Sequence, residues 1–286
     1  MEKEIKDYKV AGFVLKPNAK EIKDIYLKIK EQFEAYGIEV MLDKTSAKMI
    51  DLEGVEFKKM CKVCDFLVSL GGDGTLLSLV RRSYKYNKPV AGINAGNLGF
   101  LADVRISEVE NFLKQIRANE CRIDERMMIS GKIEGEGKEI NFYAFNDAVI
   151  TRPTISKMAT INVCVDNEMI NSYRGDGLII STPTGSTAYN LAADGPVVYP
   201  LTKAFILTPI CPHSLTQRPL VMPADFTINI QTPNKRLVVV IDGQDSYELD
   251  CNDTLSIKGA CKSAKLLHRK ERNYFRVLRD KLSWGE

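Results

Sequence analysis

The chain has 286 residues, of which 44% are hydrophobic and 27% charged, and its formal net charge is +3. This length predicts about two domains with a substantial buried core, and the composition excludes an intrinsically disordered chain. The near balance of 40 Lys and Arg against 37 Asp and Glu gives no reason to expect a nucleic-acid-binding surface.

The first part of the sequence alternates short β-type runs with amphipathic helical patterns. Strands are predicted at residues 10–15, 38–42, 65–70 and 89–94, and helices at about 18–37, 75–86 and 107–118. Asn18 and Glu21 form a capping-box-like start for the first helix, and Gly37 ends it. This alternation predicts an α/β domain with a mainly parallel sheet over residues 1–102.

After about residue 118 the sequence changes to paired β-type runs. A GEG turn at 135–137 and an Asp-Asn turn at 166–167 each separate two runs, and four further runs follow, FTINIQT, LVVVIDGQ, SYELD and TLSIKGA. They predict a second, all-β, sandwich-like domain over residues 103–265.

The C-terminal tail, residues 266–286, has its own apolar pattern. Phe275, Leu278 and Leu282 follow each other at helical spacing, and Trp284 is the sole tryptophan. A helix this short is not stable alone in water, so we expect the tail to pack back on the first domain.

The N-terminus and the cysteines bear on location and metals. The apolar run at 10–15 is far shorter than a signal-peptide core or a membrane span of ~20 residues, so the protein is expected to be cytoplasmic. Seven scattered cysteines indicate reduced thiols. Cys61 and Cys64 form a CxxC pair, but no second pair completes a zinc site, and no structural metal is expected.

A glycine-rich turn follows the predicted strand at 65–70. Its residues are Gly71, Gly72, Asp73, Gly74 and Thr75, and a helical pattern begins there. Glycines allow close backbone approach and a helix N-terminus offers unpaired N–H groups, so the turn is a candidate phosphate site. Asp73 would repel phosphates unless it binds Mg²⁺ or accepts a proton from an attacking hydroxyl, the two tasks of a kinase site. The alternative is a tight turn in which Asp73 only caps the helix.

Two further turns are candidates for ligand binding. NAGNLGFL at 94–101 follows another buried strand, so it would share the C-terminal edge of the sheet with the first turn, unless its glycines serve only packing. The stretch from 177 to 193 carries no charge but is rich in hydroxyl and amide groups that suit a nucleotide or sugar: Ser181, Thr182, Thr184, Ser186, Thr187, Tyr189 and Asn190. Asp176 can accept from a ribose or a carboxamide, or it can be a turn aspartate.

Six motifs then follow in a recognisable order: GGDGT, NxGxLGFL, the Asn-acid pair of FNDAVI, DGLIxSTPTGSTAY, PHSL/RPLV and DGQ. These motifs and their order resemble those of the NAD kinase family from about residue 65 to 245. The segment FRVLRDKLSW resembles the C-terminal tail of the same family. The resemblance implies transfer of the γ-phosphoryl group of ATP to the 2′-hydroxyl of the adenosine ribose of NAD, giving NADP. GGDGT alone is shared with diacylglycerol and sphingosine kinases, whereas the long fourth motif is highly specific.

The resemblance also assigns roles to individual positions. Asp73 corresponds to the proton acceptor, Gly74 and Phe100 lie against the dinucleotide, and Asn146 and Asp147 replace an Asn-Glu pair that contacts ribose and amide groups. The phosphate-binding positions are Gly71, Gly72, Gly74 and Thr75. The remaining substrate-binding positions are Lys157, Arg174, Asp176, Thr187, Ala188, Tyr189, Asn190, Ala192 and Gln244. The sequence departs from the family at Ser78, where Arg or His is common, at Ala192, where Ser is common, and at Asp194, where glycine is usual.

Substrates, metal and assembly follow from the same resemblance. It implies NAD and ATP as substrates, a divalent metal such as Mg²⁺ that accompanies ATP, and a homodimer or homotetramer in which Lys157 and Arg174 can reach a neighbouring subunit's site. No nucleic-acid or membrane partner is expected. Two alternatives remain: a lipid kinase, disfavoured because 173–196 is polar, and an inactive dinucleotide sensor, disfavoured because GGDGT is intact although Ser78, Ala192 and Asp194 depart from the family.

Overall fold

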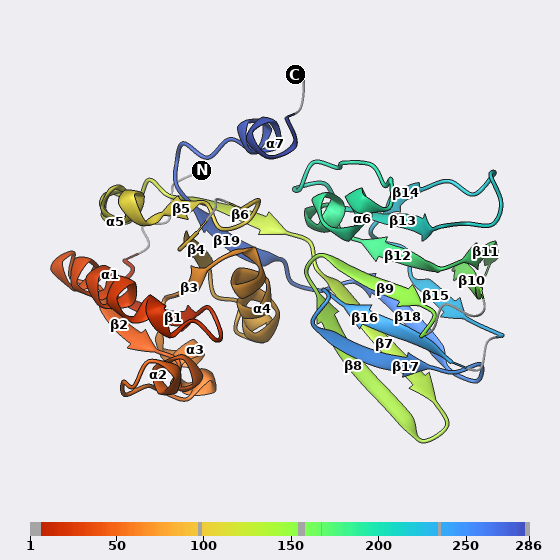
Figure 1. The fold of residues 1–286 in the computed structure, drawn as a ribbon, viewed down its shortest axis with the longest axis horizontal. Coiled ribbons are helices and arrows are strands. Elements are labelled where there is room, and N and C mark those ends of the chain that lie inside the picture. The colour runs from red at the N-terminus through yellow and green to blue at the C-terminus, as the bar shows by residue number, and fades with distance from the viewer. Residues whose placement is uncertain (1–6, 97–98, 154–157, 167, 234–235, 284–286) are drawn as a thin grey trace. The chain divides into compact units, whose positions relative to one another are not determined.

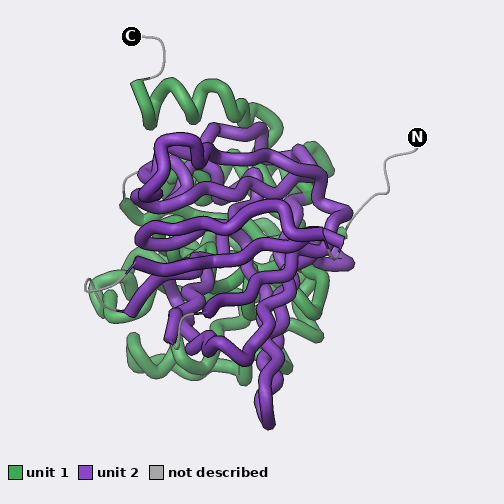
Figure 2. Tube along the Cα trace, turned by 90° about the vertical axis from the view of Figure 1, so that its right-hand side faces the viewer, with its two compact units in different colours: residues 1–125, 264–286 green, residues 126–263 purple. Residues whose placement is uncertain are grey.

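The computed structural model describes residues 7–96, 99–153, 158–166, 168–233 and 236–283. The chain divides into two compact units, residues 1–125 with 264–286 and residues 126–263 (Figure 2). The division differs from the predicted boundary, because residues 103–125 belong to the first unit. No helix in the described ranges is both long and apolar enough to cross a membrane.

Unit 1 contains a seven-stranded sheet in the order β2-β1-β3-β4-β19-β6, with β5 also on β4 (Figure 1). Its strands are β1 (Val10–Leu15), β2 (Glu39–Leu42), β3 (Phe66–Gly71), β4 (Val90–Asn94), β5 (Val104–Arg105), β6 (Arg122–Arg126) and β19 (Ala264–His268). The pairings of β1 with β2 and β3, and of β4 with β3, β5 and β19, are parallel. Strands β5 and β6 therefore explain why residues 103–125 belong to this unit.

The helices of unit 1 are α1 (Lys23–Ala35), α2 (Lys44–Met49), α3 (Phe57–Val63), α4 (Asp73–Ser83), α5 (Val109–Arg117) and α7 (Tyr274–Leu282), with 3-10 turns at η1 (Lys20–Ile22), η2 (Tyr84–Tyr86) and η3 (Ile106–Glu108). Helices α2 and α3 are not among the elements predicted from the sequence. The predicted capping box at Asn18 is wrong: Asn18 has a φ of 56° and lies in a turn, so the first helix begins as 3-10 at Lys20 with no side-chain cap.

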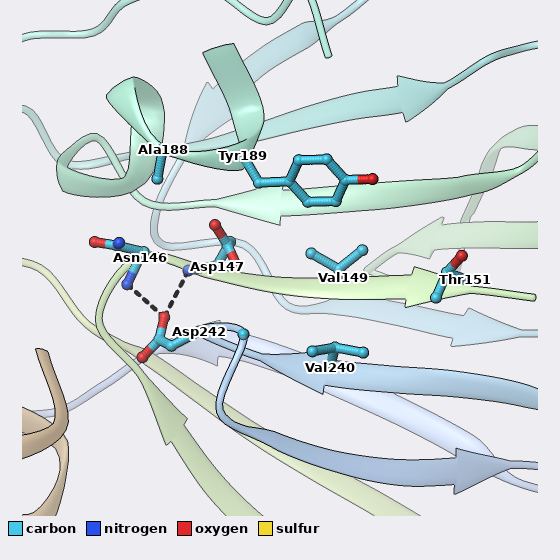
Figure 3. A pocket seen from close by; sticks show the side chains of 9 residues that line it. Asn146, Asp147, Val149, Thr151, Ala188, Tyr189, Val240 and Asp242 are labelled. Atoms are coloured by element: carbon cyan, nitrogen blue, oxygen red, sulfur yellow. Dashed lines mark hydrogen bonds between the residues drawn. The ribbon is translucent and has the colours of Figure 1, made fainter. Parts of the chain in front are cut away.

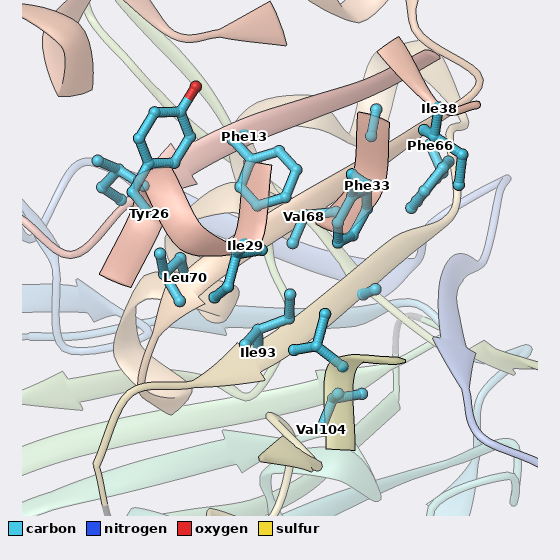
Figure 4. Close-up of a cluster of buried hydrophobic side chains, with 14 of the residues drawn as sticks. Phe13, Tyr26, Ile29, Phe33, Ile38, Phe66, Val68, Leu70, Ile93 and Val104 are labelled. Carbon is cyan, nitrogen blue, oxygen red and sulfur yellow. The ribbon is translucent and has the colours of Figure 1, made fainter. Parts of the chain in front are cut away.

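The core of unit 1 packs aromatic side chains of α1 against β1 and β3 (Figure 4). Phe13 and Phe33 meet edge to face with ring centroids 5.0 Å apart, and Phe66 joins them. On the other face of β3, Leu67 lies beside Gly12 and Met60 of α3. Because helices cover both faces, the strands are apolar runs without alternation, as in parallel sheets generally.

Unit 2 consists of two six-stranded antiparallel sheets, in the orders β11-β10-β15-β18-β7-β8 and β14-β13-β12-β9-β16-β17. The strands of the first are β7 (Ile129–Gly135), β8 (Lys138–Ala144), β10 (Ala159–Val165), β11 (Glu168–Gly175), β15 (Ile228–Gln231) and β18 (Thr254–Gly259). Those of the second are β9 (Asp147–Thr151), β12 (Gly177–Ser181), β13 (Ala204–Ile210), β14 (Leu220–Pro223), β16 (Leu237–Ile241) and β17 (Asp245–Leu249). Alternate residues of both sheets fill one apolar core, so the predicted sandwich is confirmed.

The tail forms helix α7, which belongs to unit 1 by its contacts. Asn273 caps it, since its side chain accepts the N–H groups of Phe275 and Arg276 at 2.9 and 3.3 Å. The expected apolar face is wrong in detail: Val277 and Leu278 are buried, but Phe275 is 58% exposed. Trp284 lies outside the described residues.

Candidate active site

The GGDGT turn joins β3 to α4 at the carboxyl edge of the sheet in unit 1. Gly71 is the last residue of β3, Gly72 is the N-cap of α4 and Asp73 is its first residue. The neighbouring parallel strand β4 ends in register, with Asn94 opposite Gly71, so the two predicted turns do share one edge of the sheet.

The carboxylate of Asp73 does not cap α4. It accepts three consecutive backbone N–H groups from the loop after β4: Phe100 N–H to Oδ2 at 2.7 Å, Leu101 N–H to Oδ1 at 3.1 Å and Ala102 N–H to Oδ1 at 2.9 Å. The alternative of a simple helix cap is therefore wrong, because the acceptor faces a loop almost thirty residues away in the sequence. The three donors fix the direction of the carboxylate and leave one lone pair, on Oδ2.

Gly99 permits this close approach of the loop, whereas Gly72 and Gly74 are not needed for it. A Cβ on Gly99 would lie 2.0 Å from Oδ1 of Asp73, so only glycine allows the loop to come this close. At Gly72 and Gly74 a Cβ would have nothing within 4 Å. Packing within the chain thus does not require glycine at either position, and the backbone there is open to the close approach of a ligand.

In unit 2 a second aspartate, Asp242, also accepts three consecutive backbone N–H groups. Asp242 and Gly243 are the first two residues of the three-residue turn between β16 and β17, and their φ angles of 50° and 64° are both positive. The carboxylate of Asp242 accepts the N–H groups of Phe145, Asn146 and Asp147 at 2.8, 2.7 and 2.9 Å. The DGQ motif therefore holds the Asn-acid pair in place, a task that the sequence analysis did not assign to Asp242.

A cavity of about 390 Å³ opens beside this turn, within the range of small-molecule sites (Figure 3). Four predicted binding residues line it: Asn146, Asp147, Ala188 and Tyr189. The other lining residues are Val149, Thr151, Val240, Asp242 and Gly243. Alternation along β9 is the signal that could have found Val149 and Thr151, because they share a face of the strand with Asp147.

Asp147 is the unusual titratable group of this cavity. It is 4% exposed, and burial together with the charge of Asp242 raises its pKa to about 7. The Asn146 amide oxygen beside it is buried and has no hydrogen-bond partner among the described residues. A buried amide oxygen of this kind can accept from a ligand N–H or O–H group. Asn146, Asp147 and Asp242 make part of the cavity lining polar, and Val149 and Val240 make part of it apolar.

Three of the six hydroxyl groups of the 177–193 stretch, those of Ser181, Thr182 and Ser186, donate to backbone carbonyls within the protein. Ser181 and Thr182 donate to the carbonyls of Asn146 and Phe145 at 3.2 and 2.6 Å. Asn190 is fully buried and donates to two carbonyls at 3.0 Å each, while its oxygen accepts from Thr208 at 2.7 Å. Both N–H donors of its side chain therefore have partners within the protein, and one lone pair of its oxygen remains.

The other predicted residues lie in several places of unit 2. Arg174 is exposed on β11, Thr187 ends the 3-10 turn η4 (Thr184–Thr187), and Ala192 and Gln244 are exposed. Ala188 to Ala192 run through the short helix α6 (Tyr189–Ala192). The cavity lining includes none of Arg174, Thr187, Ala192 and Gln244. Lys157 lies outside the described residues.

Two acidic residues near this stretch have clear local roles. Asp176 follows β11 and forms an ion pair with Arg152, whose Nη2 lies 2.6 Å from Oδ1. Asp194 has a φ of 59°, the left-handed conformation that explains why a glycine is usual at this position and why an aspartate, which tolerates it, can replace the glycine.

Comparisons with known proteins identify both halves. The family described as the ATP-NAD kinase N-terminal domain matches residues 11–121, and the ATP-NAD kinase C-terminal domain matches residues 145–269. An NAD kinase of Sulfurimonas denitrificans is 51% identical over 97% of this chain and 98% of its own, and one of Wolinella succinogenes is 50% identical over 96% and 95%.

Solved structures show the same fold. Yeast NADH kinase complexed with NADH matches with a TM-score of 0.89 at 22% identity, over 98% of this chain and 89% of its own. An NAD kinase from Archaeoglobus fulgidus in complex with ATP matches with a TM-score of 0.76 at 26% identity, over 96% and 98%.

Proposed function

The chain belongs to the NAD kinase family, and from this premise we propose how its residues divide the phosphorylation of NAD by ATP. The enzyme is an ATP-dependent NAD kinase that transfers the γ-phosphoryl group to the 2′-hydroxyl of the adenosine ribose and forms NADP. Neither the lipid kinase nor the inactive sensor is retained, because relatives with half of their residues identical along the whole chain are NAD kinases.

Asp73 is the proposed proton acceptor for the 2′-hydroxyl. The observation that supports it is the carboxylate held by three N–H groups at the start of α4, where its direction is fixed before substrate arrives. Such preorganisation is what general-base catalysis requires. The proposed phosphate site is the turn at the start of α4, Gly71, Gly72, Gly74 and Thr75, because its glycines let a phosphate approach the backbone closely and the N-terminal end of a helix favours negative charge.

A divalent metal fits this turn as a companion of ATP. Among the described residues no group of three or more His, Cys, Asp or Glu side chains could hold a metal ion by itself. Mg²⁺ is commonly held by one or two carboxylates together with substrate phosphates, and Asp73 is a carboxylate within the phosphate turn. When bound, the metal would neutralise developing phosphate charge.

The cavity of unit 2 is the proposed site for part of NAD. Asn146 and Asp147 offer polar atoms to ribose or amide groups, and Val149, Val240 and Tyr189 offer apolar walls. Lys157, Arg174, Asp176, Thr187, Ala192 and Gln244 remain proposed contacts from the family resemblance, and a homodimer or homotetramer would bring Lys157 and Arg174 to a neighbouring subunit. Asn190 remains a proposed contact from the same resemblance, through the second lone pair of its side-chain oxygen, because both of its N–H groups have partners within the protein.

The direct test is NADP formation by the purified protein from NAD with ATP and Mg²⁺, and its loss after chelation of the metal. The cavity assignment is tested by Ala188→Leu, which adds volume to the wall. We expect the KM for NAD to rise while the KM for ATP stays constant. An unchanged KM for NAD would contradict this use of the cavity.

A further inference from the structure

A buried charged cluster of unit 1 lies next to the loop that holds Asp73. It joins His268, at the end of β19, and Arg272, four residues later, to Asp103. Their side chains are 2%, 3% and 6% exposed. None of the six motifs of the family resemblance contains His268, Arg272 or Asp103.

Arg272 makes the contacts that matter for the loop. Its Nη2 donates to the carbonyl of Phe100 at 2.6 Å, its Nε lies 3.4 Å from Oδ2 of Asp103, and its Nη1 contacts the ring of His268. His268 Nδ1 lies 3.1 Å from the same Asp103 oxygen, and its Nε2 lies 3.6 Å from Oδ2 of Asp124. Burial lowers the pKa of His268, so near neutral pH Arg272 supplies the cation beside Asp103.

One peptide group connects this cation with Asp73. The Phe100 carbonyl that accepts from Arg272 and the Leu101 N–H that donates to Asp73 Oδ1 belong to the same trans peptide and point in opposite directions. A positive guanidinium on the oxygen side and a negative carboxylate on the N–H side polarise the peptide in the same sense. Hydrogen bonds aligned in such a chain strengthen one another.

We propose that Arg272 is a positioning residue for catalysis, which orients the carboxylate of Asp73 through the Phe100–Leu101 peptide group. Without Arg272, the carbonyl of Phe100 loses its charged donor and this peptide can rotate away from Asp73. Small errors in the direction of a catalytic group lower turnover strongly, whereas the phosphate turn and the cavity of unit 2 keep their own contacts. The effect should therefore appear in kcat and leave the KM values of both substrates unchanged.

Three variants of the full-length enzyme test the proposal. In Arg272→Gln we expect kcat to fall about 10- to 100-fold, with the KM for NAD and for ATP within about twofold of wild type. Arg272→Lys keeps the positive charge but lacks the guanidinium group that reaches Phe100 and Asp103 together. Its kcat should therefore lie between those of the wild type and Arg272→Gln. Arg269→Gln is the matched control, because Arg269 pairs with Glu108 and the Asp103 carbonyl and not with Phe100, and it should keep the wild-type kcat.

Several outcomes would overturn the proposal. A wild-type kcat in folded Arg272→Gln and Arg272→Lys would do so. A higher KM with an unchanged kcat in the Arg272 variants would also do so, and so would a loss of kcat in Arg269→Gln as large as that in Arg272→Gln. If Arg272→Gln does not fold, Arg272→Lys decides on the same measurements, because it retains the buried charge.

A double variant separates this inference from the proposed role of Asp73, on which it rests. If Arg272 acts through Asp73, Asp73→Asn combined with Arg272→Gln turns over no more slowly than Asp73→Asn alone. Multiplied losses would indicate a structural role for Arg272 and refute the positioning role. If Asp73→Asn by itself keeps its turnover, the failure belongs to the base assignment.

Discussion

Replacing Asp73 by asparagine separates the chemical task of this residue from its structural one. The asparagine oxygen can take the place of Oδ1 and keep the N–H groups of Leu101 and Ala102, but its NH₂ group then faces the N–H of Phe100, which donated at 2.7 Å. One hydrogen bond to a charged acceptor is lost, at a cost of about 1.5 to 3 kcal/mol. For a unit of this size the Tm should fall by roughly 3 to 12 °C.

The chemical loss is expected to be much larger than the structural one. Loss of a general base typically lowers the rate about 10²- to 10⁴-fold, so kcat should collapse at temperatures where the variant is fully folded, while the affinity for NAD changes little. The assay is NADP formation at saturating NAD, ATP and Mg²⁺, with the folded fraction measured by near-ultraviolet circular dichroism. Turnover above about a tenth of wild type would refute the base assignment.

Asp242→Asn provides the comparison, because Asp242 holds three N–H groups of unit 2 in the same manner. Its Tm should fall by a similar amount. The loop that it holds carries Asn146 and Asp147, so we expect a higher KM for NAD with kcat within about tenfold of wild type. Equal collapse of kcat in both variants would indicate that the three hydrogen bonds, and not the basicity of Asp73, control the rate.

Three further predictions concern other parts of the chain. Asp176→Ala should raise the Kd for NAD roughly 10- to 150-fold by calorimetric titration, since it removes one charged hydrogen-bond partner; an unchanged Kd would end this assignment. Asp147 has a raised pKa of about 7, so it is protonated in the folded state and ionised in the unfolded state between about pH 4 and 7. The free energy of unfolding should therefore fall as pH rises through this window. When Tm is measured from pH 4.5 to 7.5, Asp147→Asn should lack the contribution of Asp147 to this decrease of stability with pH. Truncation after residue 272 removes the buried side chains of Val277 and Leu278, and the burial of each stabilises the fold by about 1.5 to 3 kcal/mol. The Tm should therefore fall clearly, and an unchanged Tm would show that the end of the chain is frayed.

The sequence alone determined many of the strands and helices, though not α2 and α3, and it located the two turns at the sheet edge. Apolar runs without alternation, as at 65–70, and alternating runs around glycine or aspartate turns are local signals, because side-chain periodicity and turn conformation depend on neighbours in the chain. The glycine-rich turn could be predicted for the same reason, because its strand, its glycines and the start of its helix are consecutive in the chain.

Only the tertiary structure decided which polar groups are available for chemistry. Asp73 finds its donors 27 to 29 residues away, Asp242 finds them 95 to 97 residues away, and Arg272 reaches Phe100 across 172 residues. The hydroxyl-rich stretch predicts a ligand-binding surface, but in the structure the side chains of Ser181, Thr182 and Asn190 donate to backbone carbonyls. Sequence shows which donors and acceptors a chain possesses, but every buried one must find a partner, and which partner it finds depends on packing between segments that are distant along the chain.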